Sequence, residues 1–155
     1  MNKTTPLWIV IVILSSVIFG FAYKFIVLGN TAPGDDGRTA VVLTKSERQA
    51  VLEEMRTLLI ASQRVVLALA NEDMQAVVDA ATPVGSDAIS TVDFNLRAKL
   101  PLAFKKLGFA THHAFDDIAT MAREGKPTAE IQLKLADTMN NCIACHASFQ
   151  LPEAD

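Results

Sequence analysis

Apolar residues follow two different patterns along this chain. Residues 7–28 are almost uninterruptedly apolar, whereas from residue 44 onward apolar positions recur at intervals of three and four. The first pattern is long enough for a helix that crosses a bilayer, which takes about 20 residues. The second pattern is typical of helices that bury one face. The sequence therefore predicts one transmembrane helix followed by an all-α domain.

The second pattern divides into four predicted helices, and no stretch of it shows the alternation of a strand. Thr44 and Glu47 have the spacing of a capping box, Asn71 can cap the second helix, and prolines suit the first turns of the last two. Residues 82–100 are compatible with a loop, a helical turn or a continuation of the second helix. Four helices with mostly short connections predict a four-helix bundle. They extend from Thr44 to Leu69, from Asn71 to Ala81, from Pro101 to Ala122 and from Pro127 to Phe149.

The apolar run at 7–28 has two interpretations. It exceeds the core of a cleaved signal peptide, which spans roughly 7–15 residues, and this favours an uncleaved anchor preceded by a cytoplasmic N-terminus at 1–6. Trp8 and Tyr23 lie near its ends, as interfacial aromatic residues do. Residues 29–43 contain several Gly, Pro and Asp residues and predict a flexible linker. The domain itself then covers residues 44–155.

The chain contains two cysteines, and both lie in the sequence Cys142-Ile143-Ala144-Cys145-His146. This C-x-x-C-H pattern is the signature of covalent haem attachment. Two thiols at this helical spacing can add to the two vinyl groups of one haem, and the imidazole of His146 then becomes the proximal iron ligand. We therefore expect one covalently bound haem c.

Two other uses of the cysteines stay open at this point. A redox dithiol would sit at the start of a helix that follows a strand, whereas this pair lies deep in a predicted helix near the chain end. A zinc site would need further ligands, for which His112 and His113 are the remaining histidines. Neither alternative matches the local sequence as well as haem does.

A helical domain of this length, with one C-x-x-C-H almost at its end, resembles the class II c-type cytochromes, the cytochrome c′ and cytochrome c-556 family. The resemblance covers roughly residues 44–150 and implies a four-helix bundle in the bacterial periplasm, often dimeric. It also implies that the first helix of the bundle supplies the distal side of the haem. Members of this family commonly have an arginine followed four residues later by the distal residue, and this spacing matches Arg48 and Leu52. The match implies that Arg48 lies near a haem propionate and that Leu52 leaves the sixth position of the iron open. Matched by chemistry instead, Met55 is the distal thioether ligand, and ligation of the iron by His146 and Met55 is the prediction for an electron carrier.

These features predict a single-pass protein of the bacterial inner membrane with its haem domain in the periplasm, carrying electrons between redox proteins of a respiratory chain. A five-coordinate haem protein that binds nitric oxide or carbon monoxide is the alternative. A gas-detoxifying enzyme is a third possibility, in which His112 would be the distal polar group. His112 is also the second candidate, after Met55, for the distal iron ligand. The net charge of −3 gives no support to nucleic-acid binding. Arg97, Lys99, Lys105 and Lys106 form a basic cluster suited to an acidic redox partner or lipid headgroups.

Overall fold

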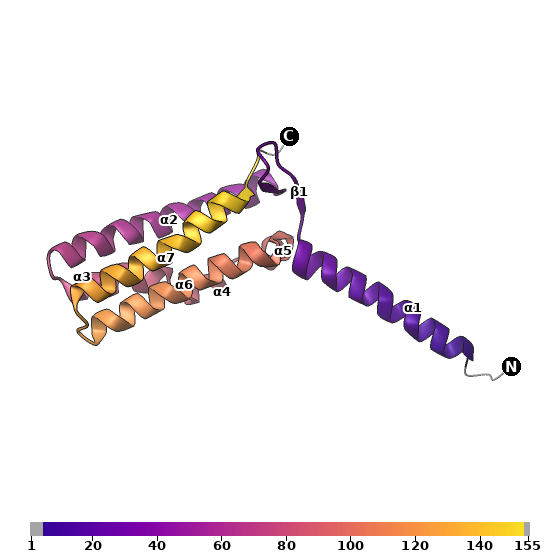
Figure 1. Cartoon of the computed structure of the whole chain (residues 1–155), viewed down its shortest axis with the longest axis horizontal. Coiled ribbons are helices and arrows are strands. Elements are labelled where there is room, and N and C mark those ends of the chain that lie inside the picture. The colour runs from indigo at the N-terminus through magenta and orange to yellow at the C-terminus, as the bar shows by residue number, and fades with distance from the viewer. Residues whose placement is uncertain (1–4, 154–155) are drawn as a thin grey trace.

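The computed structural model describes residues 5–153 and divides into a projecting helix and a helical domain (Figure 1). Helix α1 (Thr5–Ala22) continues as a π-helix, η1 (Tyr23–Leu28), and its apolar side chains are exposed rather than packed in a core. Residues 7–28 have the length and composition of a membrane span, and a signal sequence near an N-terminus meets the same criteria. The prediction of one N-terminal apolar helix is confirmed.

Three long helices of the domain begin close to where the sequence predicts. Helix α2 (Lys45–Ala70) starts at the Thr44 capping box, in which Glu47 N donates to Thr44 Oγ1 and Thr44 N donates to Glu47 Oε2. Helices α6 (Leu102–Arg123) and α7 (Thr128–Ser148) each follow a proline directly. Local signals of this kind act within one helical turn, so they identify helix starts well.

The short helix α3 (Met74–Ala81) is capped differently from the prediction. Asp73 Oδ1 accepts a hydrogen bond from Ala76 N at 2.9 Å, while Asn71 lies at the C-terminal end of α2. The expectation that Asn71 caps this helix is therefore wrong, because the chain needs Asn71 and Glu72 to turn between the two helices. Residues 82–100 form three short elements: a 3-10 helix η2 (Thr82–Val84), α4 (Asp87–Ser90) and α5 (Phe94–Lys99).

The domain is mainly α but also contains a small sheet, which corrects the prediction of an all-α fold. Strands β1 (Thr31–Pro33) and β2 (Thr39–Val41) pair in antiparallel fashion, and β2 pairs in parallel with β3 (Phe149–Gln150). Residues 29–43 are thus a hairpin rather than the expected flexible linker, and Val41 and Leu43 are buried. Strands of two or three residues are too short to give a visible alternation in the sequence.

The long helices pack side by side and divide the core into two clusters. Helix α6 packs along both α3 and α7, and α2 packs against α3 and, more loosely, α7. The first cluster fills the end of the domain away from α1 and includes Val65, Phe115 and Ile131. The second cluster lies at the end nearer α1 and joins the hairpin to α5 and α6 through Val41, Leu96, Phe104 and others. A cavity lies between these two clusters.

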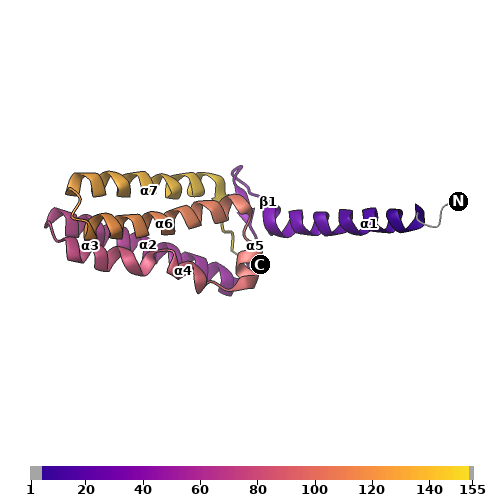
Figure 2. The same ribbon diagram turned by 90° about the horizontal axis from the view of Figure 1, so that it is seen from below.

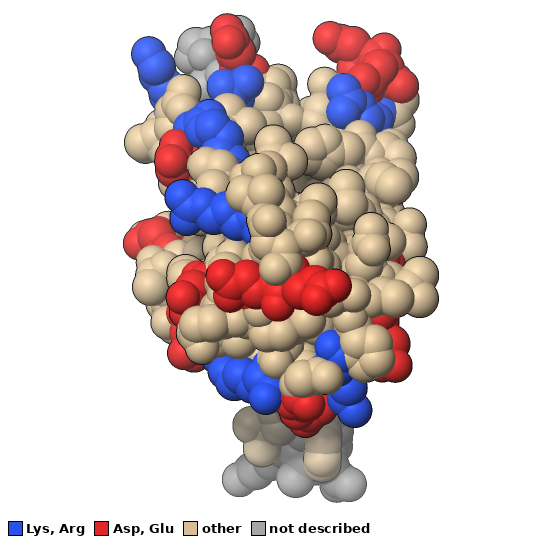
Figure 3. All heavy atoms as spheres, turned by 90° about the vertical axis from the view of Figure 1, so that its left-hand side faces the viewer, with Lys and Arg blue, Asp and Glu red and all other residues tan. Residues whose placement is uncertain are grey.

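The two ends of the domain are marked by different chain connections. Helix α1 leaves from the end at which α5, β1 and the C-terminal end of α7 meet (Figures 1 and 2). The opposite end shows acidic and basic side chains side by side (Figure 3). At this end α2 connects to α3 and α6 connects to α7. The exposed charged residues of these connections are Glu72, Asp73, Arg123, Glu124 and Lys126. Charges of both signs at one end are typical of a solvated surface.

Candidate functional site

A cavity of about 500 Å³ opens between α2, α6 and α7 and is closed on one side by residues of the 89–100 segment. This volume lies within the range of roughly 300–1,000 Å³ that is typical of cofactor sites. Most of its walls are apolar, and they include members of both core clusters, such as Val51 and Phe115. Cys142, Cys145 and His146 all line it from the last turns of α7. The structure thus brings the whole C-x-x-C-H sequence to one apolar cavity.

The two thiols differ in their surroundings. Cys142 is exposed and Cys145 is partly buried against the second cluster. Burial raises the pKa of the Cys145 thiol, and the neighbouring Cys142 adds to this effect. Both lie near the C-terminal end of α7, where the helix dipole disfavours a thiolate. A reactive dithiol needs the opposite conditions, a lowered pKa at a helix N-terminus, so this geometry argues against that alternative.

The wall opposite α7 is formed by α2 and contains both candidate distal residues. Leu52 and Met55 line the cavity, and each is partly buried. Arg48 is not part of the cavity wall, and its Nε donates a hydrogen bond to the Leu151 carbonyl at 2.9 Å. The chain after α7 therefore already engages the arginine that the resemblance places near a propionate.

His112 is buried within α6 and has partners on both ring nitrogens. Nδ1 lies 2.8 Å from the Val84 carbonyl oxygen and Nε2 lies 2.9 Å from Glu54 Oε1. Burial disfavours the imidazolium, but the hydrogen bonds to Glu54 and to the Val84 carbonyl outweigh it and raise the pKa of His112. A carbonyl can only accept, so Nδ1 carries a proton. Because both nitrogens are engaged, the arrangement argues against His112 as an iron ligand.

Arg97 is a cavity residue that sequence reasoning assigned only to a surface cluster. Its Nε is buried and has no hydrogen-bond partner among the residues that the structure describes. Asp93 Oδ1 caps the start of α5 by accepting from Asn95 N and Leu96 N, and so fixes the helix that carries Arg97. A buried guanidinium nitrogen without a partner is costly, and an anionic group in the cavity would satisfy it. No motif in the sequence marks this residue.

The hairpin holds the end of the helix that carries His146. Arg38 Nη1 donates to the carbonyl oxygens of His146 and Phe149 at 3.1 and 3.2 Å, and Arg38 also pairs with Asp36. These bonds satisfy carbonyls that the end of an α-helix leaves without partners. The parallel pairing of β2 with β3 continues the attachment beyond α7. Residues expected to be a linker therefore position the proposed proximal ligand.

The structure also bears on the zinc alternative. Across residues 5–153, no three His, Cys, Asp or Glu side chains are grouped so that they could hold a metal ion. His113 is exposed and lies next to Asp116 on the outer face of α6.

Comparison of the chain with family models, with curated proteins and with solved structures finds no match.

Proposed function

We propose that this protein is a membrane-anchored c-type cytochrome of the class II kind, with one haem bound covalently to Cys142 and Cys145. The observation that carries the proposal is that both cysteines and His146 line a single, mainly apolar cavity between α2, α6 and α7. Helices α2, α3, α6 and α7 then correspond to the four helices of the bundle. The proposal also places the domain in a bacterial periplasm, at the outer face of the inner membrane.

The residues of the cavity fit a haem in three respects. Apolar side chains from both clusters suit the porphyrin face, and the thiols are adjacent on one helix for two thioether bonds. The Nε of Arg97, which has no hydrogen-bond partner within residues 5–153, suits a propionate, and this makes Arg97 a better candidate for that contact than Arg48. A haem so held supplies one-electron chemistry.

The chain's own residues favour electron transfer over other chemistry. His146 would act as the proximal ligand, and Met55 on the opposite wall offers a thioether that favours the reduced state and a six-coordinate iron. The mainly apolar walls would keep water away from most of a bound haem, which would limit solvent reorganisation when the charge of the site changes. His112 is engaged by Glu54 and Val84, so it does not provide a free distal acid or base. We therefore propose an electron carrier of a respiratory chain rather than an enzyme.

The second candidate function is the binding of nitric oxide or carbon monoxide. It rests on Leu52, which lines the same wall as Met55 and would leave the iron open if it occupied the distal position. The test is the absorption spectrum of the purified, reduced protein with and without carbon monoxide. A low-spin spectrum that carbon monoxide leaves unchanged supports the carrier, whereas a high-spin spectrum with rapid gas binding supports the alternative. A mature chain whose mass contains no porphyrin would refute both.

Arg97 provides a second, independent test. Its replacement by Gln removes a positive charge beside the proposed propionate, so we expect the reduction potential to fall while the thioether bonds keep the haem attached. Arg64→Gln is the matched control, because Arg64 lies on α2 outside the cavity and is exposed. Equal potentials for the parent, Arg97→Gln and Arg64→Gln proteins would show that Arg97 does not contact the haem.

A further inference from the structure

The junction between η1 and the helical domain is closely packed. Gly29 is buried at a φ of 65°, and a Cβ atom there would lie 2.4 Å from the Lys99 carbonyl oxygen and 2.6 Å from Pro101 N. Both neighbours are backbone atoms, which cannot move aside as a flexible side chain would. Glycine is therefore required here both for its conformation and for the close approach.

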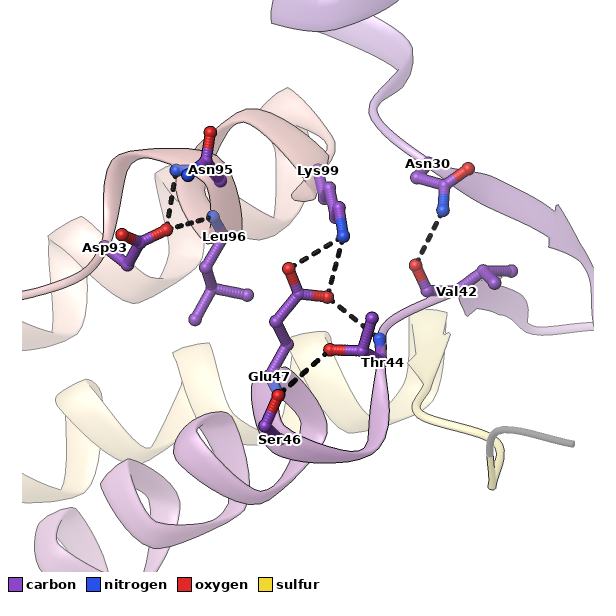
Figure 4. A network of polar contacts seen from close by, with 9 residues as sticks. All are labelled: Asn30, Val42, Thr44, Ser46, Glu47, Asp93, Asn95, Leu96 and Lys99. Carbon is purple, nitrogen blue, oxygen red and sulfur yellow. Dashed lines mark hydrogen bonds and ion pairs between the residues drawn. The ribbon is translucent and has the colours of Figure 1, made fainter.

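Hydrogen bonds on both sides of Gly29 fix the same junction. Asn30 N donates to the Lys99 carbonyl at 2.7 Å, and Asn30 Nδ2 donates to the Val42 carbonyl at 2.8 Å. Figure 4 shows the latter bond at the point where the chain leaves η1 for the hairpin. On the N-terminal side of Gly29, the Ile26 carbonyl in η1 accepts a hydrogen bond from Lys105 Nζ at 3.2 Å. The last turn of the apolar helix is thus bonded to the start of α6.

The same network reaches the rest of the domain. Lys99 Nζ contacts both carboxylate oxygens of Glu47 at 2.7 and 2.9 Å, and Glu47 belongs to the capping box of α2 (Figure 4). The hairpin connects in turn to β3 and to the end of α7. Lys105 also lines the cavity. One side chain therefore spans from the apolar helix to the wall of the proposed haem site.

We propose that Gly29 and Asn30 form a rigid mount that holds the cavity end of the domain against the surface of the lipid bilayer in which residues 7–28 are embedded. The proposal rests on the proposed function, in that it takes residues 7–28 as an uncleaved anchor. The partner is the headgroup layer of the membrane. Lys105, which bonds to Ile26 in η1, and the exposed Lys106 lie at this end and suit anionic headgroups, although Asp35 and Asp36 of the hairpin are exposed at the same end.

A rigid mount has a consequence that a flexible linker would not have. With a flexible linker the domain would tumble on its tether, and the cavity would sample many distances from the membrane. With the mount, the cavity stays at the interface in one orientation. Electron exchange would then favour partners that are themselves confined to the membrane or its surface.

The test uses the full-length protein in phosphatidylcholine–phosphatidylglycerol vesicles that contain a lipid with a fluorescent headgroup. A haem held at the interface quenches this fluorescence by energy transfer. We expect strong quenching for the parent chain and loss of most of it when a flexible Gly-Ser segment is inserted between Leu28 and Gly29. The same segment inserted between Gly125 and Lys126, in the exposed connection between α6 and α7 at the opposite end of the domain, is the matched control and should keep the quenching.

Equal quenching by the parent and the Leu28–Gly29 insertion would overturn the proposal, as would a mature protein that lacks residues 7–28 and stays in the aqueous phase. A chain without covalent haem would instead refute the proposed function. In that case the exposed thiol of Cys142 can carry the fluorophore, and a headgroup spin label can act as the quencher. The comparison of insertions then decides on the mount alone.

Discussion

Gly108 offers a quantitative test of where the proposed haem lies. It occupies the interior of α6 and lines the cavity, and a Cβ atom added there would meet no atom within 4 Å. Its φ is not positive, so an L-residue fits the backbone. Glycine inside a helix costs about 0.5–1 kcal/mol relative to alanine. In a chain whose cysteines are both replaced by serine, Gly108→Ala should therefore raise the free energy of unfolding by about 0.5–1 kcal/mol.

Gly125 is the matched control for this substitution. It too has open space around its Cβ position, but its φ is 66°, in the left-handed region that follows many helices. Gly125→Ala should lower the free energy of unfolding by about 1 kcal/mol, because L-residues are strained there. Urea unfolding in detergent, followed by far-ultraviolet circular dichroism, measures both values. Opposite signs for the two glycines are the expected result.

The same substitution in the haem-bearing protein then reports on the cofactor. If the porphyrin lies against α6 at Gly108, an added methyl group meets it, and the gain in stability disappears. Gly108→Leu should disturb the haem spectrum as well, since the larger side chain occupies the space of the ring. An equal gain from Gly108→Ala in the haem-free and haem-bearing proteins would refute this placement.

Three further predictions concern other parts of the domain. Met55→Leu should convert a six-coordinate reduced spectrum to a five-coordinate one and allow carbon monoxide to bind; an unchanged spectrum would show that Met55 is not a ligand. Hydrogen bonds from Lys99 and the α2 N-terminus lower the pKa of Glu47, so its carboxylate stabilises the fold at neutral pH and this contribution is lost as the pH falls through the lowered pKa. Glu47→Gln should thus cost about 1 kcal/mol at pH 7 and little in strong acid, whereas Glu53→Gln, an exposed control, should have almost no effect in urea unfolding at either pH. In the haem-free chain iodoacetamide should modify Cys145 more slowly than Cys142 and require higher pH, as peptide mass spectrometry can measure; equal rates would contradict the raised pKa.

The sequence predicted those features whose cause is local. The start of α2 depends on Thr44 and Glu47, which are three positions apart, and the starts of α6 and α7 depend on adjacent prolines. Helical spacing also places Leu52 and Met55 on the side of α2 that faces the cavity. In each case the information lies within one or two turns of helix.

The features that the sequence did not predict depend on contacts between distant segments. The parallel pairing of β2 with β3 joins residues 39–40 to residues 149–150, and no periodicity in either segment indicates it. Arg48 has the expected position on α2, yet its Nε is taken by the Leu151 carbonyl from the far end of the chain. Arg97 belongs to a six-residue helix within a stretch that gave no clear pattern. Helical spacing identifies a face, but it does not identify the partner of a long side chain.

The position of the cavity between the two core clusters links the proposed haem to the stability of the fold. The turns of α7 that carry Cys142 and His146 contain no fully buried side chain: the last fully buried residue of this helix is Thr138, and Cys145 is only partly buried. This end of α7 is held chiefly by the hairpin, through Arg38 and the pairing of β2 with β3. A porphyrin bonded there would give these turns an apolar surface to pack against and would join one cluster to the other. The proposed haem would then complete the core as well as carry the electron, and its attachment should raise the stability of the C-terminal half of α7 more than that of α3.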